Sequence, residues 1–162
     1  MGLLRFAQAN TPEGSSITIA DISEIPFYNA DIAEKPAAVI QLLQLAAEAD
    51  AFVFACPEYN YSIAPALKNA LDWISREANS PLNGKALAIM GSGGGMGTSR
   101  AQYHLRQVCV FLNMHPLNKP EVFANAFANQ FDAEGNLVDT KVQDTIKTQL
   151  SALVTWATQL KK

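Results

Sequence analysis

The sequence has few of the residues that bind metals or form disulfides. Its 162 residues include two histidines and two cysteines, and Cys56 and Cys109 each lie inside an apolar stretch with no C-x-x-C pair. No cluster of His, Cys and Asp has the spacing of a metal site, so we expect no bound metal. We predict that Cys56 and Cys109 are buried free thiols rather than a disulfide or a redox pair.

Long apolar runs and a strong net charge are absent as well. No run approaches the roughly 18 apolar residues that a membrane-spanning helix needs, and the amino terminus lacks the basic and apolar parts of a signal peptide. The net charge of −3 gives no electrostatic reason to expect nucleic acid or an anionic membrane as a partner. We therefore expect a cytoplasmic protein that binds neither nucleic acid nor membrane.

The composition that remains is ordinary for a globular protein, with 49% hydrophobic and 17% charged residues. This mix argues against disorder. A chain of this length can bury a real core, and no linker divides it, so we expect one domain over residues 1–162.

Predicted strands and helices alternate along the chain, which is typical of an α/β fold with a parallel sheet. Apolar patterns predict helices at 1–10, 36–48, 64–76, 98–112 and 141–160, strands at 16–22, 51–55, 85–90 and 114–122, and an irregular loop at 125–139. Residues 51–55 are apolar on both faces and are therefore expected in the middle of the sheet. Pro116 and Pro120 interrupt the last strand and place it at an edge.

A polar turn with the sequence PEYNYS follows the predicted strand at 51–55 and leads into a helix. Open α/β sheets bind their ligands at the carboxyl ends of strands. The rings of Tyr59 and Tyr61 beside backbone donors would suit a flat aromatic ligand. The alternative is a plain polar connection in which Ser62 is the N-cap of the helix.

A second turn, GSGGGMG at 91–97, follows the predicted strand at 85–90. Its glycines would let the backbone approach a ligand closely, although it is neither a G-x-G-x-x-G fingerprint nor a P-loop. The alternative is a flexible loop. Because both turns follow adjacent parallel strands, we expect them to face each other across one crevice.

The remaining polar residues give weaker signals. His104 and His115 are expected to be structural or solvent-exposed, and the pair Asp72 and Arg76 to lie on a solvated helix surface or at a subunit contact. No Ser/His/Asp, Cys/His or paired-carboxylate arrangement stands out. We therefore assign no catalytic side chain and expect a cofactor to carry any chemistry.

Several short motifs occur in a fixed order along the chain. The PEYNYS turn at 57–62 is followed by LKNALDW at 67–73, the glycine turn at 91–97, RAQ at 100–102, LRQ at 105–107 and PEVF at 120–123. Together these motifs resemble the NAD(P)H-dependent FMN reductases, a flavodoxin-like family of quinone, azo-dye, chromate and flavin reductases. The resemblance runs from about residue 17 to the carboxyl terminus.

The resemblance implies an enzyme that passes hydride from NADPH or NADH through bound FMN to a small-molecule acceptor such as a quinone, flavin or azo compound. No obligatory side-chain acid or base is implied. A homodimer or homotetramer is implied, with residues 68–76 near an interface. The implied FMN-binding residues are Pro57, Glu58, Tyr59, Asn60, Ser62, Gly91, Ser92, Gly93 and Gly94.

The sequence departs from the family at its start. Family members begin with a strand and a G-S-x-R-x-x-S-x-N type loop that binds the FMN phosphate, whereas this sequence begins with the tail of the first helix. The resemblance thus implies a flavodoxin-like parallel sheet with flanking helices but only four strands, in which residues 16–22 pair with residues 51–55. The crossover helices would lie on one face of the sheet, leaving residues 1–10 and 141–160 to cover the other.

Three interpretations of this departure remain open: exposed apolar surface drives self-association, another chain fills the gap, or the natural protein starts earlier. Loss of the phosphate contacts would weaken FMN binding. An alternative to the reductase is therefore a non-catalytic family remnant that acts as an oligomeric binding module. A third possibility is a flavodoxin-like electron carrier without its own NAD(P)H site.

Overall fold

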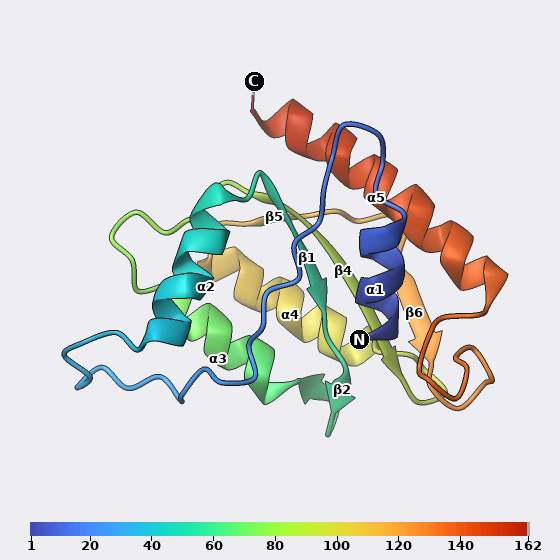
Figure 1. Cartoon of the computed structure of the whole chain (residues 1–162), viewed down its shortest axis with the longest axis horizontal. Coiled ribbons are helices and arrows are strands. Elements are labelled where there is room, and N and C mark those ends of the chain that lie inside the picture. Colours follow the sequence, from blue (N-terminus) through green and yellow to red (C-terminus); the bar gives the residue numbers. More distant parts are fainter. Residues whose placement is uncertain (162) are drawn as a thin grey trace.

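The computed structural model describes residues 1–161 as a parallel four-stranded sheet between two layers of helices, with a separate two-stranded hairpin (Figure 1). This confirms the predicted α/β class. The helices are α1 (Gly2–Ala9), α2 (Ala37–Glu48), α3 (Pro65–Ile74), α4 (Ser99–Phe111) and α5 (Thr140–Leu160). The strands are β1 (Ala51–Ala55), β2 (Glu58–Tyr59), β3 (Ser62–Ile63), β4 (Ala86–Gly93), β5 (His115–Pro116) and β6 (Val122–Asn125).

Strand β4 is the centre of the sheet. β1 pairs in parallel with one side of β4, and β5 and β6 share the other side, β5 opposite Ala86–Leu87 and β6 opposite residues 90–93. The predicted strand at 114–122 is thus two short edge strands, as its prolines indicated. Between them, Nε2 of the buried Gln149 in α5 donates hydrogen bonds to the carbonyl oxygens of Ile89 (3.0 Å) and Pro120 (2.8 Å).

Helices cover the two faces of the sheet as predicted. The larger core cluster joins α2, α3 and α4 to Phe54, Leu87 and Ile89 of the sheet. A second cluster packs α1 and α5 against Met90 and Val122. In Figure 1, α2 and α3 lie on the left of β1 and β4, and α1 and α5 lie on the right. None of the helices within residues 1–161 has the length and apolar character to cross a membrane.

The predicted strand at 16–22 is wrong. This segment is extended but is not a strand, because none of its backbone groups forms a hydrogen bond with β1 among the described residues. Its carbonyl group at Ile17 instead accepts a hydrogen bond from Nε2 of Gln8 (2.9 Å). An extended chain becomes a strand only when a neighbour pairs with it. The number of strands is still four, because the region 114–125 supplies two.

The predicted position of β1 is also wrong. β1 pairs only with β4 and is an edge strand, not a central one. Its side chains are apolar on both faces because Phe52 and Phe54 pack toward α2 and α3 while Val53 and Ala55 pack toward α1 and α5. The apolar run at 51–55 therefore predicted correctly that both faces of β1 are covered, but it could not show that one edge of the strand is free.

Both cysteines are buried free thiols, as predicted. Burial raises the pKa of the Cys109 thiol from 9.0 to about 11, and burial also raises the pKa of Cys56.

Since the thiolate is the reactive form, we expect neither thiol in the folded protein to react with a disulfide reagent near neutral pH. The stability that the neutral Cys109 thiol contributes should be lost as pH rises from about 9 toward 11. Thiol titration and urea midpoints across that range measure both effects, and rapid labelling of the folded chain would contradict them.

Candidate functional site

The predicted polar turn is a tight β-hairpin. β2 and β3 pair antiparallel, with Glu58 opposite Ile63 and Tyr59 opposite Ser62. The two residues at the tip, Asn60 and Tyr61, have positive φ angles of 51° and 66°. This is the backbone of a two-residue hairpin turn, which asparagine adopts readily and a bulky tyrosine does only at a cost of about 1–3 kcal/mol.

Ser62 is not an N-cap, contrary to the alternative considered for this turn. The N-cap of α3 is Ala64, and Pro65 occupies the first helical turn, where its missing N–H costs nothing. Ser62 instead belongs to β3, and its hydroxyl lies 2.8 Å from Nδ1 of His104. The turn therefore has its own structure and does not merely start a helix.

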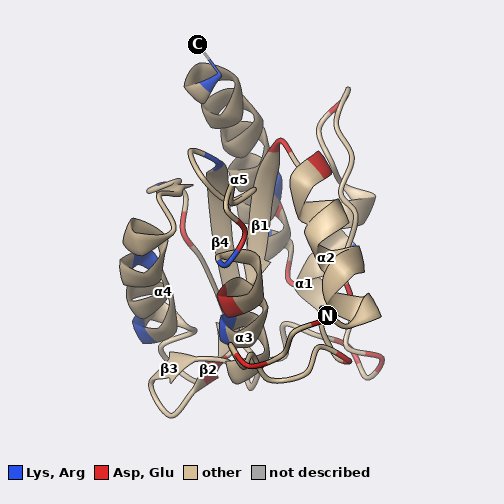
Figure 2. Cartoon of the chain, turned by 90° about the vertical axis from the view of Figure 1, so that its left-hand side faces the viewer, with Lys and Arg blue, Asp and Glu red and all other residues tan. Residues whose placement is uncertain are grey.

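The amino-terminal turn of α4 holds the hairpin in place. Nε of Arg100 donates to a carboxylate oxygen of Glu58 (2.6 Å), and the Ala101 backbone N–H donates to the other oxygen (3.1 Å). The Glu58 side chain is only 6% exposed, so this charged contact is largely shielded from solvent. Figure 2 shows the hairpin of β2 and β3 below α4.

The same arginine also contacts the strained tip. The Arg100 guanidinium lies over the Tyr61 ring, 3.6 Å from its centroid. A cation–π contact at a partly exposed site contributes about 0.5–1 kcal/mol, which offsets part of the backbone cost of Tyr61. Arg100 and His104 are one helical turn apart on α4, so one helix face contacts the carboxylate, the ring and the hydroxyl of the hairpin.

Sequence reasoning did not assign Arg100 or His104 to the site. Their spacing of four residues on the helix that follows the glycine turn is the only local signal that could have identified them. His104 is exposed, as expected, but the hydrogen bond to Ser62 was not predicted.

The predicted glycine turn at 91–97 is wrong in its first part, because residues 91–93 form the end of β4 and pair with β6. The glycines of this segment fall into two groups. A Cβ added to Gly91 would lie 2.3 Å from the Cys56 carbonyl oxygen, one on Gly93 would lie 2.2 Å from the Gly97 carbonyl oxygen, and one on Gly97 would lie 2.6 Å from the Phe123 Cβ. These three glycines are required by the packing of the chain itself. In contrast, a Cβ on Gly94 or Gly95 would meet nothing within 4 Å. Those two positions leave open space beside the backbone.

Ser92 lies near the carboxyl end of β4 and has an unusual hydroxyl. Its Oγ is buried and has no hydrogen-bond partner within residues 1–161. A buried hydroxyl without a partner costs about 1–3 kcal/mol, so a native protein seldom keeps one without a reason. A bound polar molecule would supply the missing partner.

The structure places the two predicted segments at the same edge of the sheet. β1 and β4 are neighbours, the Cys56 N–H donates to the Met90 carbonyl (2.9 Å), and residues 57–62 follow β1 at the edge where residues 91–93 end β4. We call the residues 57–63 and 91–97 the two-turn site. No group of three or more His, Cys, Asp or Glu side chains in the described part of the chain is placed to hold a metal.

A parallel sheet with helices on both faces and a glycine turn beside an aromatic hairpin at the carboxyl edge defines a nucleotide-binding protein of the flavodoxin-like class. The family model described as NADPH-dependent FMN reductase matches residues 2–129. The chain belongs to this family, and it is an NAD(P)H-dependent oxidoreductase whose cofactor is FMN.

The curated relatives carry corresponding names. An NAD(P)H-dependent FMN reductase of Pseudomonas aeruginosa is 52% identical over 161 residues, which cover 98% of this chain and 87% of the relative. An NADPH:quinone oxidoreductase of Arabidopsis thaliana is 46% identical over 167 residues, which cover 98% of this chain and 85% of the relative. These matches favour the reductase over the non-catalytic remnant that the sequence left open.

Solved structures agree on the fold. FerB, a flavoenzyme NAD(P)H:(acceptor) oxidoreductase from Paracoccus denitrificans, has a TM-score of 0.86 at 27% sequence identity, covering 98% of this chain and 88% of that chain. The flavodoxin-like fold implied by the sequence motifs is thereby confirmed.

Proposed function

We propose that the two-turn site holds the isoalloxazine ring of FMN and that the enzyme uses NAD(P)H to reduce a quinone or a similar small acceptor. The observation that carries this proposal is the unpartnered, buried Ser92 hydroxyl beside the open backbone of Gly94. An extended ring with hydrogen-bonding edges fits such a site, because it needs both a polar partner and unobstructed backbone. The quinone reductases among the relatives support the choice of acceptor.

The site residues have different roles in this proposal. Gly91 and Gly93 allow the end of β4 to pack closely against the neighbouring backbone, while Ser92 and Gly94 contact the polar edge of the ring. Pro57, Tyr59, Asn60 and Ser62 form the hairpin surface against which the ring lies, and the exposed Tyr59 supplies aromatic area. Glu58 acts by positioning, since its carboxylate is already bound by Arg100 and the Ala101 N–H.

Bound FMN supplies the redox chemistry, with NADPH as the source of reducing equivalents. The protein's own residues orient the ring, satisfy its polar edge and restrict water at the hairpin side. In this proposal no side chain is assigned to donate or remove a proton.

Purified protein titrated with FMN tests the proposal. We expect saturable quenching of flavin fluorescence, loss of the oxidised flavin absorbance when NADPH is added without oxygen, and recovery of that absorbance on addition of a quinone. A chain that binds no FMN would refute the proposal. Flavin that binds but stays oxidised with both NADPH and NADH would identify an electron carrier instead.

We also propose that residues 1–162 act as one cytoplasmic domain that assembles into a homodimer or homotetramer. The two free thiols fit a reducing compartment. The outer face of α4 carries Tyr103, Val110 and Phe111, which are 64%, 80% and 75% exposed, respectively, and apolar surface of this kind favours association. Sedimentation equilibrium measures the assembly, and a monomer at all concentrations would refute it.

A further inference from the structure

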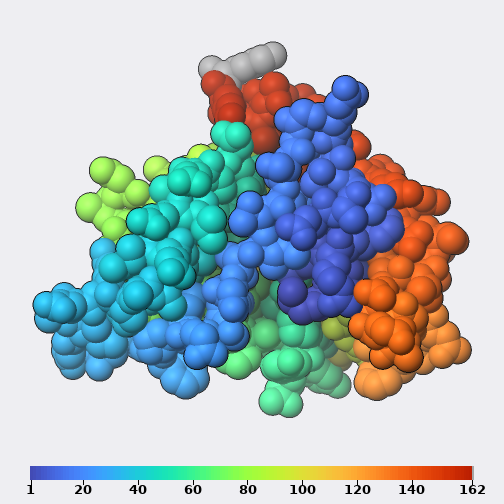
Figure 3. Space-filling view, viewed as in Figure 1, coloured from blue at the N-terminus to red at the C-terminus, as the bar shows by residue number. Residues whose placement is uncertain are grey.

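The first turn of α4 lies between the two halves of the two-turn site. The segment at 91–97 leads directly into this helix, and the hairpin reaches it through Glu58. In the space-filling view the hairpin projects from the lower edge of the molecule, apart from the segment that follows β6 (Figure 3). The position of the hairpin relative to the end of β4 therefore depends on how the first turn of α4 is held.

The N-cap residue of α4 does not cap the helix with its own side chain. Thr98 is of a type that usually accepts a hydrogen bond from an N–H group of the first turn. Here its backbone, with φ −124° and ψ 30°, is not extended as in a usual N-cap, and its side chain makes no capping bond within residues 1–161. The N–H of Ala101, the third residue of α4, donates instead to the Glu58 carboxylate (3.1 Å). The hairpin thus supplies the cap.

The Thr98 hydroxyl has a different partner inside the protein. Its Oγ1 accepts a hydrogen bond from Nε2 of Gln102 (2.9 Å), and the same nitrogen donates to the Val122 carbonyl oxygen (2.9 Å). Thr98 is fully buried, and Gln102 is only 2% exposed. A Cβ added to Gly91 would lie 2.3 Å from Thr98 Oγ1, so this hydroxyl packs directly against the backbone of β4. One amide group therefore fixes α4 to the ends of β4 and β6.

We propose that Thr98 and Gln102 are positioning residues of the flavin site. They hold the first turn of α4 against the ends of β4 and β6, and that turn holds the hairpin through Glu58. Neither residue contacts the flavin in this arrangement. The inference rests on the proposed function, because it takes the flavin ring to contact both the hairpin and the end of β4.

Stability alone explains this pair less completely. Two apolar side chains of the same shape could replace a buried hydrogen-bonded pair at little cost, and a capping hydroxyl on Thr98 would support α4 directly. Apolar contacts, however, tolerate small shifts of a helix. Hydrogen bonds from one amide to two oxygens fix both a distance and a direction, so a buried polar network specifies a single position. Such a fixed position is what a site made from two separate segments requires.

Gln102→Met tests the proposal in the whole protein. Methionine is unbranched and apolar, so it fills the same space while removing both hydrogen bonds. We expect FMN affinity, measured by flavin fluorescence titration, to fall at least about fivefold. With FMN at saturation, the visible circular dichroism of the bound flavin should also differ from that of the wild type, because the ring would contact a displaced hairpin. An unchanged affinity and spectrum would overturn the proposal.

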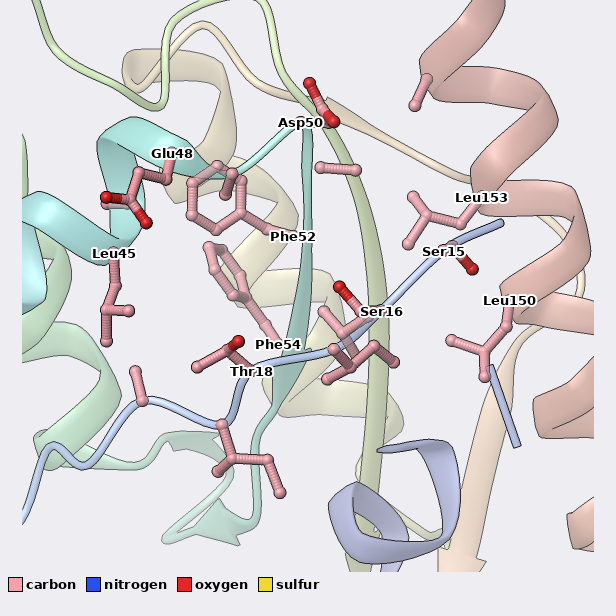
Figure 4. A pocket seen from close by; sticks show the side chains of 18 of the residues that line it. Ser15, Ser16, Thr18, Leu45, Glu48, Asp50, Phe52, Phe54, Leu150 and Leu153 are labelled. Atoms are coloured by element: carbon pink, nitrogen blue, oxygen red, sulfur yellow. The ribbon is translucent and has the colours of Figure 1, made fainter. Parts of the chain in front are cut away.

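Gln149→Met is the matched control. Gln149 is likewise a buried helical glutamine whose Nε2 donates to two oxygens, but it lies on α5. Its neighbours Leu150 and Leu153 line a hollow of about 640 Å³ along β1, away from the two-turn site (Figure 4). We expect Gln149→Met to lower the urea midpoint but to keep FMN affinity within about twofold. If both variants lost FMN affinity equally, general loss of stability would explain the effect and the positioning role would be wrong.

The hydroxyl of Thr98 can be tested separately. Thr98→Ser keeps this hydroxyl and should bind FMN within about twofold of the wild type. Thr98→Val keeps the shape of the side chain, loses the hydroxyl and should resemble Gln102→Met in affinity and spectrum. Normal FMN binding by Thr98→Val would remove Thr98 from the positioning pair.

A double-mutant cycle tests whether Gln102 acts through the hairpin. If it does, FMN affinity of the double variant Gln102→Met and Glu58→Gln should be within about twofold of that of Glu58→Gln alone. Single effects that multiply in the double variant would show independent action and contradict the proposal. A wild-type chain that binds no FMN would refute the proposed function and this inference with it. Wild-type binding that Gln102→Met leaves unchanged would refute the inference alone.

Discussion

Gly91→Ala is expected to destabilise the protein by at least about 3 kcal/mol, the upper end of the range for inserting atoms into a packed core. The added Cβ would lie 2.3 Å from both the Cys56 carbonyl oxygen and Thr98 Oγ1. The first of these is a backbone atom between β1 and the hairpin, so relief requires the two turns to separate. Urea denaturation of the variant and the wild type measures the loss.

Gly94→Ala is the matched control for this effect. Nothing lies within 4 Å of the added Cβ, so the free energy of unfolding should change by no more than about 0.5 kcal/mol. The methyl group would, however, occupy the space assigned to the flavin edge, and we expect FMN affinity to fall about tenfold. A Gly94→Ala protein that binds FMN as the wild type does would show that the ring lies elsewhere. Loss of stability equal to that of Gly91→Ala would contradict the division of the glycines into two groups.

Glu58→Gln is expected to weaken FMN binding about 10- to 100-fold. The glutamine amide has a single acceptor oxygen, so one of the two hydrogen bonds, from Arg100 or from the Ala101 N–H, is lost and the other loses its charge assistance; together this weakens the anchor by about 1.5–3 kcal/mol. The effect on global stability should be smaller, because Arg100 is 37% exposed and can be solvated by water when its partner loses charge. Flavin fluorescence titration gives the affinity, and thermal unfolding gives the stability.

Glu121→Gln is the control for removing a carboxylate. Glu121 pairs with Lys119 (2.7 Å), but that lysine is 79% exposed, so the pair contributes little to stability.

Arg100→Lys keeps the positive charge and loses the planar contact with Tyr61. Its FMN affinity should lie between those of the wild type and Glu58→Gln. If Glu58→Gln binds FMN normally, the hairpin does not need its anchor to α4, and the positioning role of Glu58 is wrong.

The sequence predicted the parts of the fold that depend on local pattern. The helices and the buried strand β4 follow from apolar periodicity, and the two turns follow from their position after apolar runs. The prediction of a strand at 16–22 was wrong because the alternation of Ile17 and Ile19 is compatible with a strand, whereas a strand also needs a neighbouring strand to pair with. Whether β1 has one partner or two is likewise a property of the sheet and not of its own residues.

The hairpin was missed for a related reason. Short hairpin turns are usually signalled by Asn-Gly, and here a tyrosine takes the second position with positive φ. Tyr61 is held there by Arg100, and the Glu58 contact that brings this arginine to the hairpin joins residues 42 apart in the sequence. A conformation stabilised by such a distant contact has no local signature.

The hydrogen bonds of Gln149 give the last helix a role beyond covering one face of the sheet. Its amide bonds to the carbonyl groups of Ile89 and Pro120 at the point where β5 has ended and β6 has not begun. Helix α5 therefore completes the pairing of β4 where no strand does so. Detaching α5 would leave two buried carbonyl groups unpaired, so the helix and the far edge of the sheet should open together as one cooperative unit in amide hydrogen exchange.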